Sequence, residues 1–319
     1  MRRRTFLKLS TAGAAVMTAA PALRAQKKQP FHVGMAATLW LQAEAATETY
    51  WKACKAIGEL GFRATEADNT LADLDAAYGN SVAEFKKESA RHKVSLAGIY
   101  HSVELHDASQ LTSYAQRMRA ISKFLNSIGA GYIALGWGQR LRDGRRVYFQ
   151  PGQGSGRTEE EARQAVLGLN ELGKIALLEH GIKVAWHPGR NQSRDLIRRV
   201  LDGTNSDHVF FCADVGHLTG AGYDALEAVK TYRARMVASH LKDFDPKIPF
   251  RRTDYAQKIT GDFVELGQGE VNLKGLIEYY RESNFPGWVQ VELDRSPKDP
   301  MEASREMKKY LLEELRLEI

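Results

Sequence analysis

The segment VFFCADVGHLTGAGYDALEAVKTYRARMVASHL, residues 209–241, has the pattern of one strand–helix–strand unit. Apolar runs at 209–214 and 236–241 predict strands, and the amphipathic stretch at 223–232 between them predicts a helix. Two strands joined through a helix lie parallel in one sheet, because a parallel pair needs a long crossover connection. The segment therefore indicates an α/β protein with a parallel sheet.

The same alternation extends along the chain in both directions. Short apolar runs predict strands at 31–37, 62–67, 94–100, 132–136, 183–187, 209–214, 236–241 and 288–293. Amphipathic stretches predict helices at 47–60, 81–92, 109–128, 158–180, 193–203, 223–232, 272–283 and 300–317. Strand–helix units of about 35 residues in this number predict a single (β/α)8 TIM barrel over residues 26–319. A doubly wound open sheet is the alternative, but no Gly-x-Gly-x-x-Gly follows the first strand.

The net charge of the chain is unevenly distributed. The 319 residues include 45 Lys and Arg against 39 Asp and Glu, a formal charge of +6. Five of the basic residues lie in the segment 1–25, which has no acidic residue, so the rest of the chain is nearly neutral. A nucleic-acid partner needs a sustained basic stripe, and this composition argues against one.

Residues 1–25 predict an export signal. The basic head RRTFLK at 3–8 precedes an apolar stretch at 9–20 and the small residues of PALRA at 21–25. This order resembles a twin-arginine signal peptide, and we therefore expect a periplasmic or exported protein. An ordinary amphipathic N-terminal helix is the alternative. Beyond residue 25 no apolar run of about 18 residues predicts a membrane span.

Two cysteines and two long connections complete the organisation of the body. Cys54 and Cys212 are too few for a disulfide framework, and both are expected to be small buried residues. The connections at 137–157 and 243–271 are rich in basic residues and follow strands, so both are expected at the mouth of the barrel. Long loops there are lids or substrate walls, or else solvated surface.

Polar residues gather where the predicted strands end. These residues are Glu66, His101, Trp137, His187, Asp214, His217, His240, Lys242, Glu292 and Asp294. The last four strands supply the residue types that bind divalent ions, namely His187, Asp214, His240 and Glu292. The carboxyl ends of barrel strands share one mouth, and carboxylates buried together repel each other unless a cation is present. The sequence therefore predicts a metal site at this mouth.

Four phrases resemble the xylose isomerase-like TIM-barrel family: CADVGH at 212–217, SHLKD at 239–243, ELGQGE at 265–270 and VELD at 291–294. The family includes sugar phosphate isomerase/epimerases, ketose 3-epimerases and inosose dehydratases. The resemblance covers roughly residues 31–316 and implies one divalent metal ion (Mn, Mg, Co or Zn). The family's ligands are a strand-five Glu, a strand-six Asp, a strand-seven His and a strand-eight Glu.

Three of these ligand positions match, at Asp214, His240 and Glu292, whereas His187 stands where many members have Glu. The phrase WHPG at 186–189 looks closer to the inosose dehydratase branch. Imidazole also binds metals well, so His187 stays in the expected ligand set. Epimerases of the family use both glutamates as acid and base, and the histidine argues against that symmetric arrangement.

The resemblance implies removal of a proton from the carbon next to a carbonyl, with the resulting enediolate stabilised by the metal. We expect Glu292 to be a metal ligand and a base, and His187 or His101 to be the second acid or base. Lys242 is expected near the developing negative charge, and His217 is expected to contact substrate oxygens. Three residues are expected to shape the sugar pocket: Glu66, Trp137 and Asp294.

The fate of the enediolate decides the reaction. Reprotonation gives an isomerase or an epimerase, which is the primary expectation. Loss of a β-leaving group gives a lyase, such as an inosose dehydratase or a 3-keto-glycoside lyase, which is the alternative. An exported enzyme rarely meets sugar phosphates, so the expected partner is a free keto-sugar, a cyclitol or a glycoside, and neither nucleic acid nor a membrane.

Two further classes of protein fit the sequence less well. A non-catalytic carbohydrate-binding barrel is disfavoured by the full ligand set, and a metal-dependent endonuclease by the nearly neutral body. The sequence leaves a homo-oligomer open.

Overall fold

The computed structural model describes residues 29–41, 47–67, 81–138, 141–142, 145–146, 156–248 and 262–319. The expected signal segment, 1–25, lies outside these residues, so export and a domain boundary near residue 26 stay predictions. The same holds for the side chains between 139 and 155 and between 249 and 261, which include most of the basic residues expected at the mouth.

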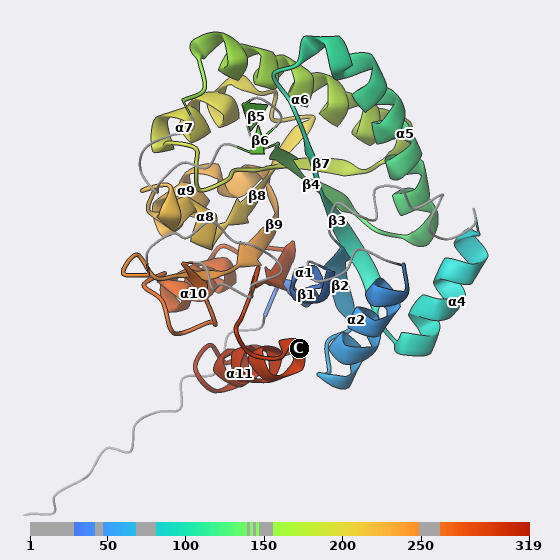
Figure 1. Cartoon of the computed structure of the whole chain (residues 1–319), viewed down its shortest axis with the longest axis vertical. Coiled ribbons are helices and arrows are strands. Elements are labelled where there is room, and N and C mark those ends of the chain that lie inside the picture. The colour runs from blue at the N-terminus through green and yellow to red at the C-terminus, as the bar shows by residue number, and fades with distance from the viewer. Residues whose placement is uncertain are drawn as a thin grey trace, which may run out of the picture.

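Parallel strands close into a barrel, which confirms the expected single (β/α)8 architecture (Figure 1). The order around the barrel is β1-β12-β9-β8-β7-β4-β3-β2, so strands that follow one another in the chain are neighbours. In chain order they are β1 (His32–Ala36), β2 (Ala64–Ala67), β3 (Ser95–Val103), β4 (Tyr132–Trp137), β7 (Lys183–His187), β8 (Val209–Asp214), β9 (Met236–Leu241) and β12 (Trp288–Val291). All their carboxyl ends therefore open on one mouth.

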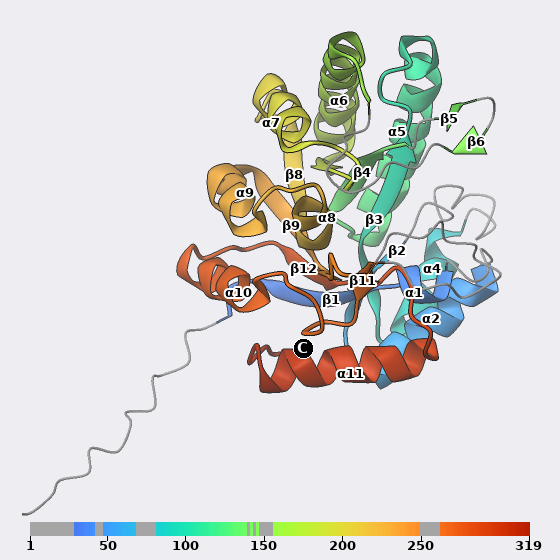
Figure 2. The same ribbon diagram turned by 60° about the vertical axis from the view of Figure 1, so that its left-hand side comes forward.

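Helices surround the ring of strands (Figures 1 and 2). The long ones are α2 (Thr47–Glu59), α4 (Val82–His92), α5 (Leu111–Ile128), α6 (Glu159–His180), α7 (Arg194–Gly203), α9 (Ala225–Tyr232), α10 (Leu273–Glu282) and α11 (Pro300–Glu313). Local signals set their ends: a capping box of Thr158 and Glu161 starts α6, and Gly181 in the left-handed conformation ends it. Within the described part of the chain, no helix has the length and apolar character needed to cross a bilayer.

The structure also contains short elements that the sequence pattern did not predict. They are the helices α1 (Thr38–Leu41) and α8 (Val215–Gly220), the 3-10 turns at Ala108–Gln110 and Arg233–Arg235, and the hairpins β5 (Leu141–Arg142)/β6 (Arg145–Arg146) and β10 (Asp243–Phe244)/β11 (Phe263–Val264). Each is too short to show a hydrophobic period. In Figure 2 the β5–β6 hairpin stands outside the ring of barrel strands.

The two faces of each strand bury different residues. One face packs large aliphatic and aromatic side chains against the helices, as Ile133 and Leu135 of β4 do. The other face lines the lumen, where a second cluster brings together residues of six strands: Ala64, Ala97, Tyr132, Ala134, Ala185, Cys212 and Ala238. Only the interior of a closed barrel unites so many strands. Most of these lumen residues are small, which leaves room for a few large polar side chains.

The SHLKD phrase places a structural carboxylate next to the site. Asp243 is buried, and its two oxygens accept hydrogen bonds from the backbone N–H groups of Phe244, Gly267, Gly269 and Val271 at 2.9–3.1 Å. The glycine-rich turn therefore wraps around one carboxylate. A Cβ on Gly269 would collide with that carboxylate and would lie 2.5 Å from the Phe244 carbonyl oxygen.

We predict that Gly269→Ala lowers the free energy of unfolding by about 1–3 kcal/mol, because the added methyl group is forced against backbone and a fixed carboxylate. The matched control is Gly131→Ala, where an added Cβ would meet nothing within 4 Å. Urea or thermal unfolding measures both variants. Equal stability of the two would show that the turn around Asp243 is not tightly packed.

We also predict that neither cysteine reacts with a thiol reagent in the folded protein. Burial raises the pKa of the Cys54 thiol to about 12 and that of Cys212 to about 11, so the reactive thiolate is absent at neutral pH. Labelling with Ellman's reagent is expected to give no fast reaction in buffer and two thiols in guanidinium. Rapid labelling in buffer would contradict the buried placement.

Candidate metal centre

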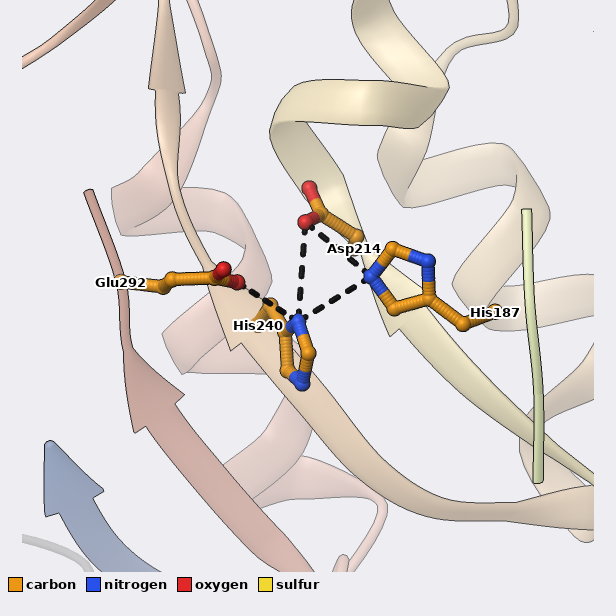
Figure 3. A group of neighbouring side chains, drawn as sticks. All are labelled: His187, Asp214, His240 and Glu292. Carbon is orange, nitrogen blue, oxygen red and sulfur yellow. Dashed lines mark hydrogen bonds and ion pairs between the residues drawn. The ribbon is translucent and has the colours of Figure 1, made fainter. Parts of the chain in front are cut away.

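Four side chains from neighbouring strands converge at the mouth of the barrel (Figure 3). His187 and Asp214 end β7 and β8, His240 lies one residue before the end of β9, and Glu292 directly follows β12. All four are buried, and one ligand atom from each lies within 4.8 Å of the others. The structure thus brings together the residues that the sequence predicted as metal ligands.

Contacts inside this cluster converge on Nδ1 of His240. This atom lies 2.7 Å from Glu292 Oε2, 3.1 Å from His187 Nε2 and 3.6 Å from Asp214 Oδ2 (Figure 3). A ring nitrogen carries at most one hydrogen, so it cannot satisfy three neighbours by donating. The arrangement therefore leaves lone pairs facing one another around a common centre.

Within the described part of the chain, two carboxylate oxygens of the cluster have ion-pair contacts but no hydrogen bond of acceptable geometry. They are Asp214 Oδ2 and Glu292 Oε2, both fully buried. Asp214 uses its other oxygen, Oδ1, to accept the backbone N–H of His217 at 2.8 Å, which starts α8 and aims Oδ2 at the cluster. Buried unsatisfied oxygens are rare and call for an ion or water. Two carboxylates and two imidazoles are a donor set that suits a divalent cation such as zinc, so these residues fit a metal ion.

Lys242 supplies a fixed positive charge beside the cluster. Its buried Nζ lies 2.8 Å from Asp294 Oδ1, 3.1 Å from Asp214 Oδ2 and 3.3 Å from Glu292 Oε1. Burial alone would lower the pKa of Lys242, but the three carboxylates raise it well above its usual value. Conversely, burial would raise the pKa of Asp214 and of Glu292, but Lys242 is the main influence that lowers both below their usual range. The lysine is therefore protonated and the carboxylates are ionised.

His217 presents one nitrogen to the mouth. The backbone N–H of Arg190 donates to His217 Nδ1 at 2.9 Å, and Nε2 lies 3.8 Å from Asp214 Oδ2. Burial lowers the pKa of His217 well below its usual value, and the charge of Lys242 lowers it further, so the ring is neutral. Because Nδ1 accepts, the ring hydrogen is on Nε2, which can donate to a substrate oxygen.

The other predicted residues lie in different surroundings. Glu66 is buried against the far edge of the His240 ring. Trp137 donates from Nε1 to His106 Nδ1 at 3.2 Å, and the Arg157 guanidinium lies 4.5 Å from the centre of the Trp137 ring. His101 pairs in register with Leu135, which packs toward the helices, so strand alternation places it on the face of β3 that points away from the lumen.

Sequence reasoning missed several residues that border the cluster. Thr38 Oγ1 donates to Glu292 Oε1 at 3.3 Å, and Tyr100 packs edge-on against His187 with ring centroids 5.1 Å apart. Phe263 lies under Arg190 at 4.9 Å and Lys242 at 4.8 Å. Thr38 is the second residue after β1, so the same strand-end rule applied there would have found it. No sequence signal marks Phe263, because it comes from a two-residue strand.

Comparison with known proteins agrees with the barrel fold. The family described as "Xylose isomerase-like TIM barrel" matches residues 54–314. Inosose dehydratase of Clostridium perfringens (strain 13 / Type A) is 27% identical over 279 residues, covering 81% of this chain and 87% of the relative.

Two solved structures share the fold. 3-Keto-D-glucoside 4-epimerase of E. coli has a TM-score of 0.62 at 18% identity, covering 88% of this chain and 98% of the other. The IolI protein with a bound zinc atom has a TM-score of 0.65 at 16% identity, covering 89% and 98%.

We predict that a divalent ion stabilises the folded protein through this cluster. At an ion concentration of about 100 times the Kd, binding adds about 2.7 kcal/mol to the free energy of unfolding. Thermal unfolding of chelator-treated protein, with and without Zn²⁺, Co²⁺, Mn²⁺ or Mg²⁺, measures the effect. His187→Ala should remove most of the shift and His180→Ala, at the end of α6, should keep it. The absence of a shift with all four ions would contradict the metal site.

Proposed function

The chain belongs to the xylose isomerase-like TIM-barrel family, and we propose that it is a divalent-metal-dependent enzyme that removes a proton next to the carbonyl of a keto-sugar or cyclitol. The observation that carries this proposal is the buried cluster with two unsatisfied carboxylate oxygens, Asp214 Oδ2 and Glu292 Oε2. Such a cluster is unfavourable on its own and becomes favourable around a cation. A non-catalytic barrel has no need for it.

His187, Asp214, His240 and Glu292 would hold the metal ion, which when bound supplies Lewis-acid polarisation of the substrate carbonyl. Lys242 adds a second positive charge within 3.3 Å of Glu292 Oε1 and 3.1 Å of Asp214 Oδ2. His217 offers its Nε2–H to a substrate oxygen, since its Nδ1 is occupied by the Arg190 N–H. These fixed donors and charges favour negative charge that develops on the substrate oxygen.

Glu292 is the group that we propose takes the proton. Its Oε2 faces the other metal-binding atoms, whereas its Oε1 accepts from Thr38 and lies beside Lys242. The C–H bond breaks, its electrons move toward the carbonyl oxygen, and the proton is transferred to the carboxylate. The proton is then returned, by the same carboxyl or by a second acid on the other face, and its destination decides the reaction class.

Elimination is the outcome that two observations favour. If Glu292 returns the proton to a departing β-oxygen, that C–O bond breaks and water or an alcohol leaves, so atoms and charge balance. This course needs one carboxylate on one substrate face, and His187 stands where a second glutamate would serve the other face. The relative in Clostridium perfringens is an inosose dehydratase, which supports the same choice.

Isomerisation or epimerisation is the second candidate. Return of the proton to the neighbouring carbon gives an isomer, and return on the opposite face gives an epimer. The shared fold with a 3-keto-D-glucoside 4-epimerase keeps this outcome open, with His187 at the end of β7 as the second acid. A solvent-derived proton would then appear in the product at carbon.

The compartment bears on the substrate. Residues 1–25 support export by a twin-arginine signal, and we propose that the enzyme acts outside the cytoplasm. Free keto-sugars, cyclitols and 3-keto-glycosides are then more accessible substrates than sugar phosphates. Expression with a C-terminal tag followed by fractionation of the periplasm tests this part separately.

We predict that purified, metal-loaded protein releases water or aglycone from inosose or a 3-keto-glucoside in deuterated water. NMR of the products distinguishes the outcomes: an unsaturated ketone with a released group indicates a lyase, and deuterium at carbon without release indicates an isomerase or epimerase. Glu292→Gln is expected to lower kcat by about 10²–10⁴ because the proton acceptor is lost. Glu278→Gln, exposed on α10, is the matched control. Retained activity in Glu292→Gln would remove this residue from the mechanism.

A further inference from the structure

The imidazole of His240 contacts carboxylates at both of its nitrogens. Nδ1 faces the metal-binding cluster, and Nε2 lies 3.0 Å from Glu66 Oε1 and 3.1 Å from Glu66 Oε2. Both side chains are buried, so water does not replace either contact. Glu66 thus lies on the opposite side of the His240 ring from the position of the metal and of any sugar bound to it.

Glu66 is itself held by a buried chain of hydrogen bonds. The Tyr132 hydroxyl donates to Glu66 Oε2 at 2.7 Å, and the Gln290 side-chain amide donates to the Tyr132 hydroxyl at 3.1 Å. These residues come from β2, β4 and β12, and all of them are buried. The amide nitrogen of Gln290 can only donate, so the Tyr132 hydroxyl accepts from it and directs its own hydrogen to the Glu66 carboxylate.

The direction of these hydrogen bonds determines which ring nitrogen of His240 carries a hydrogen. Glu66 already accepts from Tyr132, and its oxygens near His240 are acceptors as well, so they select the form of the ring with a hydrogen on Nε2. The lone pair of Nδ1 is then the one available to a metal ion. A carboxylate behind a metal-binding histidine also fixes the plane of the ring and increases the basicity of the ligand nitrogen.

Two glycines leave space in the lumen for this chain of hydrogen-bonded side chains. A Cβ on Gly98 would lie 2.6 Å from ring atoms of Tyr132, and a Cβ on Gly34 would lie 3.0 Å from Cδ of Gln290. Neither glycine has the positive φ that would by itself call for glycine. Close approach of these two large polar side chains is therefore the reason for the missing side chains. The two glycines of the lumen thus accommodate the hydrogen-bonded side chains that lead to His240.

We propose that Glu66, held by Tyr132 and Gln290, is a positioning residue that orients His240 and keeps its Nδ1 directed at the metal ion. The proposal rests on the metal site of the proposed function and adds to it three residues outside the ligand set. It replaces the expectation that Glu66 shapes the sugar pocket. Glu66 acts through His240 and does not touch the substrate.

The protein offers a control on the other face of β9, the strand that carries His240. Tyr280 is buried like Tyr132, and its hydroxyl lies 2.8 Å from Ser239 Oγ, one residue before His240. Loss of the Tyr280 hydroxyl removes its buried hydrogen bond to Ser239 of β9, and loss of the Tyr132 hydroxyl removes two buried hydrogen bonds in the lumen. Only Tyr132 is connected to the metal-binding ring. A merely structural effect is therefore expected to lower stability in both Tyr132→Phe and Tyr280→Phe without changing metal binding in either.

The experiment measures metal binding directly, with Co²⁺ and Zn²⁺ as probes. The dissociation constant is obtained by chelator competition, the visible absorption of the Co²⁺ form reports ligand geometry, and thermal unfolding reports stability. Glu66→Gln is expected to weaken binding by about 10–100-fold and to change the Co²⁺ spectrum. Tyr132→Phe is expected to act in the same direction with a smaller change. Tyr280→Phe is expected to lose stability as well but to bind metal as the wild type does.

Each outcome decides between the proposals. Wild-type affinity and an unchanged Co²⁺ spectrum in folded Glu66→Gln would overturn the positioning role while leaving the enzyme proposal intact. Weakened binding in Glu66→Gln, with no activity of the wild type on any keto-sugar or cyclitol tested, would support the positioning role and overturn the proposed reaction. A wild-type protein that binds neither ion would overturn both.

Discussion

The organisation of the mouth depends on the burial of like charges. Asp214 and Glu292 bring two ionised carboxylates into a water-excluded space, where their repulsion is strong unless positive charge is close. Lys242 supplies one charge permanently, and the positions of Asp214 Oδ2 and Glu292 Oε2 suit a divalent cation as a second, exchangeable one. Because the barrel alone sets the distance between β8 and β12, the fold determines how closely these charges approach.

The alternation of apolar and amphipathic stretches was sufficient to predict the architecture. The strand at 209–214 and the helix at 158–180 were placed almost to the residue, since long periodic segments and capping residues such as Thr158 mark themselves in the sequence. The short helix α8 was not predicted, because its start is set by a carboxylate that also serves the site. Elements of two to six residues carry no period and arise from the packing around them.

The same contrast holds for the site. The candidate ligand set followed from a rule about strand ends, which is a property of the fold and needs no knowledge of side-chain direction. That rule does not determine where the side chains of His101 and Glu66 point. Strand alternation turns His101 toward the helices, and Glu66 faces inward but is separated from the mouth by the ring of His240. The role proposed for Glu66 thus depends on its side of the His240 ring, which is decided by register and packing rather than by sequence spacing.

One consequence concerns which changes this chain tolerates. Three of the four residues from 240 to 243 have separate roles. His240 faces the candidate metal-binding cluster, Lys242 neutralises the carboxylates, and Asp243 holds the turn at 267–271. Shifting the register of β9 by a single residue would move all three at once and would bring Ser239 and Leu241 into the lumen. A point substitution at one of these residues affects one role, whereas an insertion or deletion in the strand disrupts all three. During divergence of the family, new substrates are therefore expected to come from changes in the loops, with the length of this strand held constant.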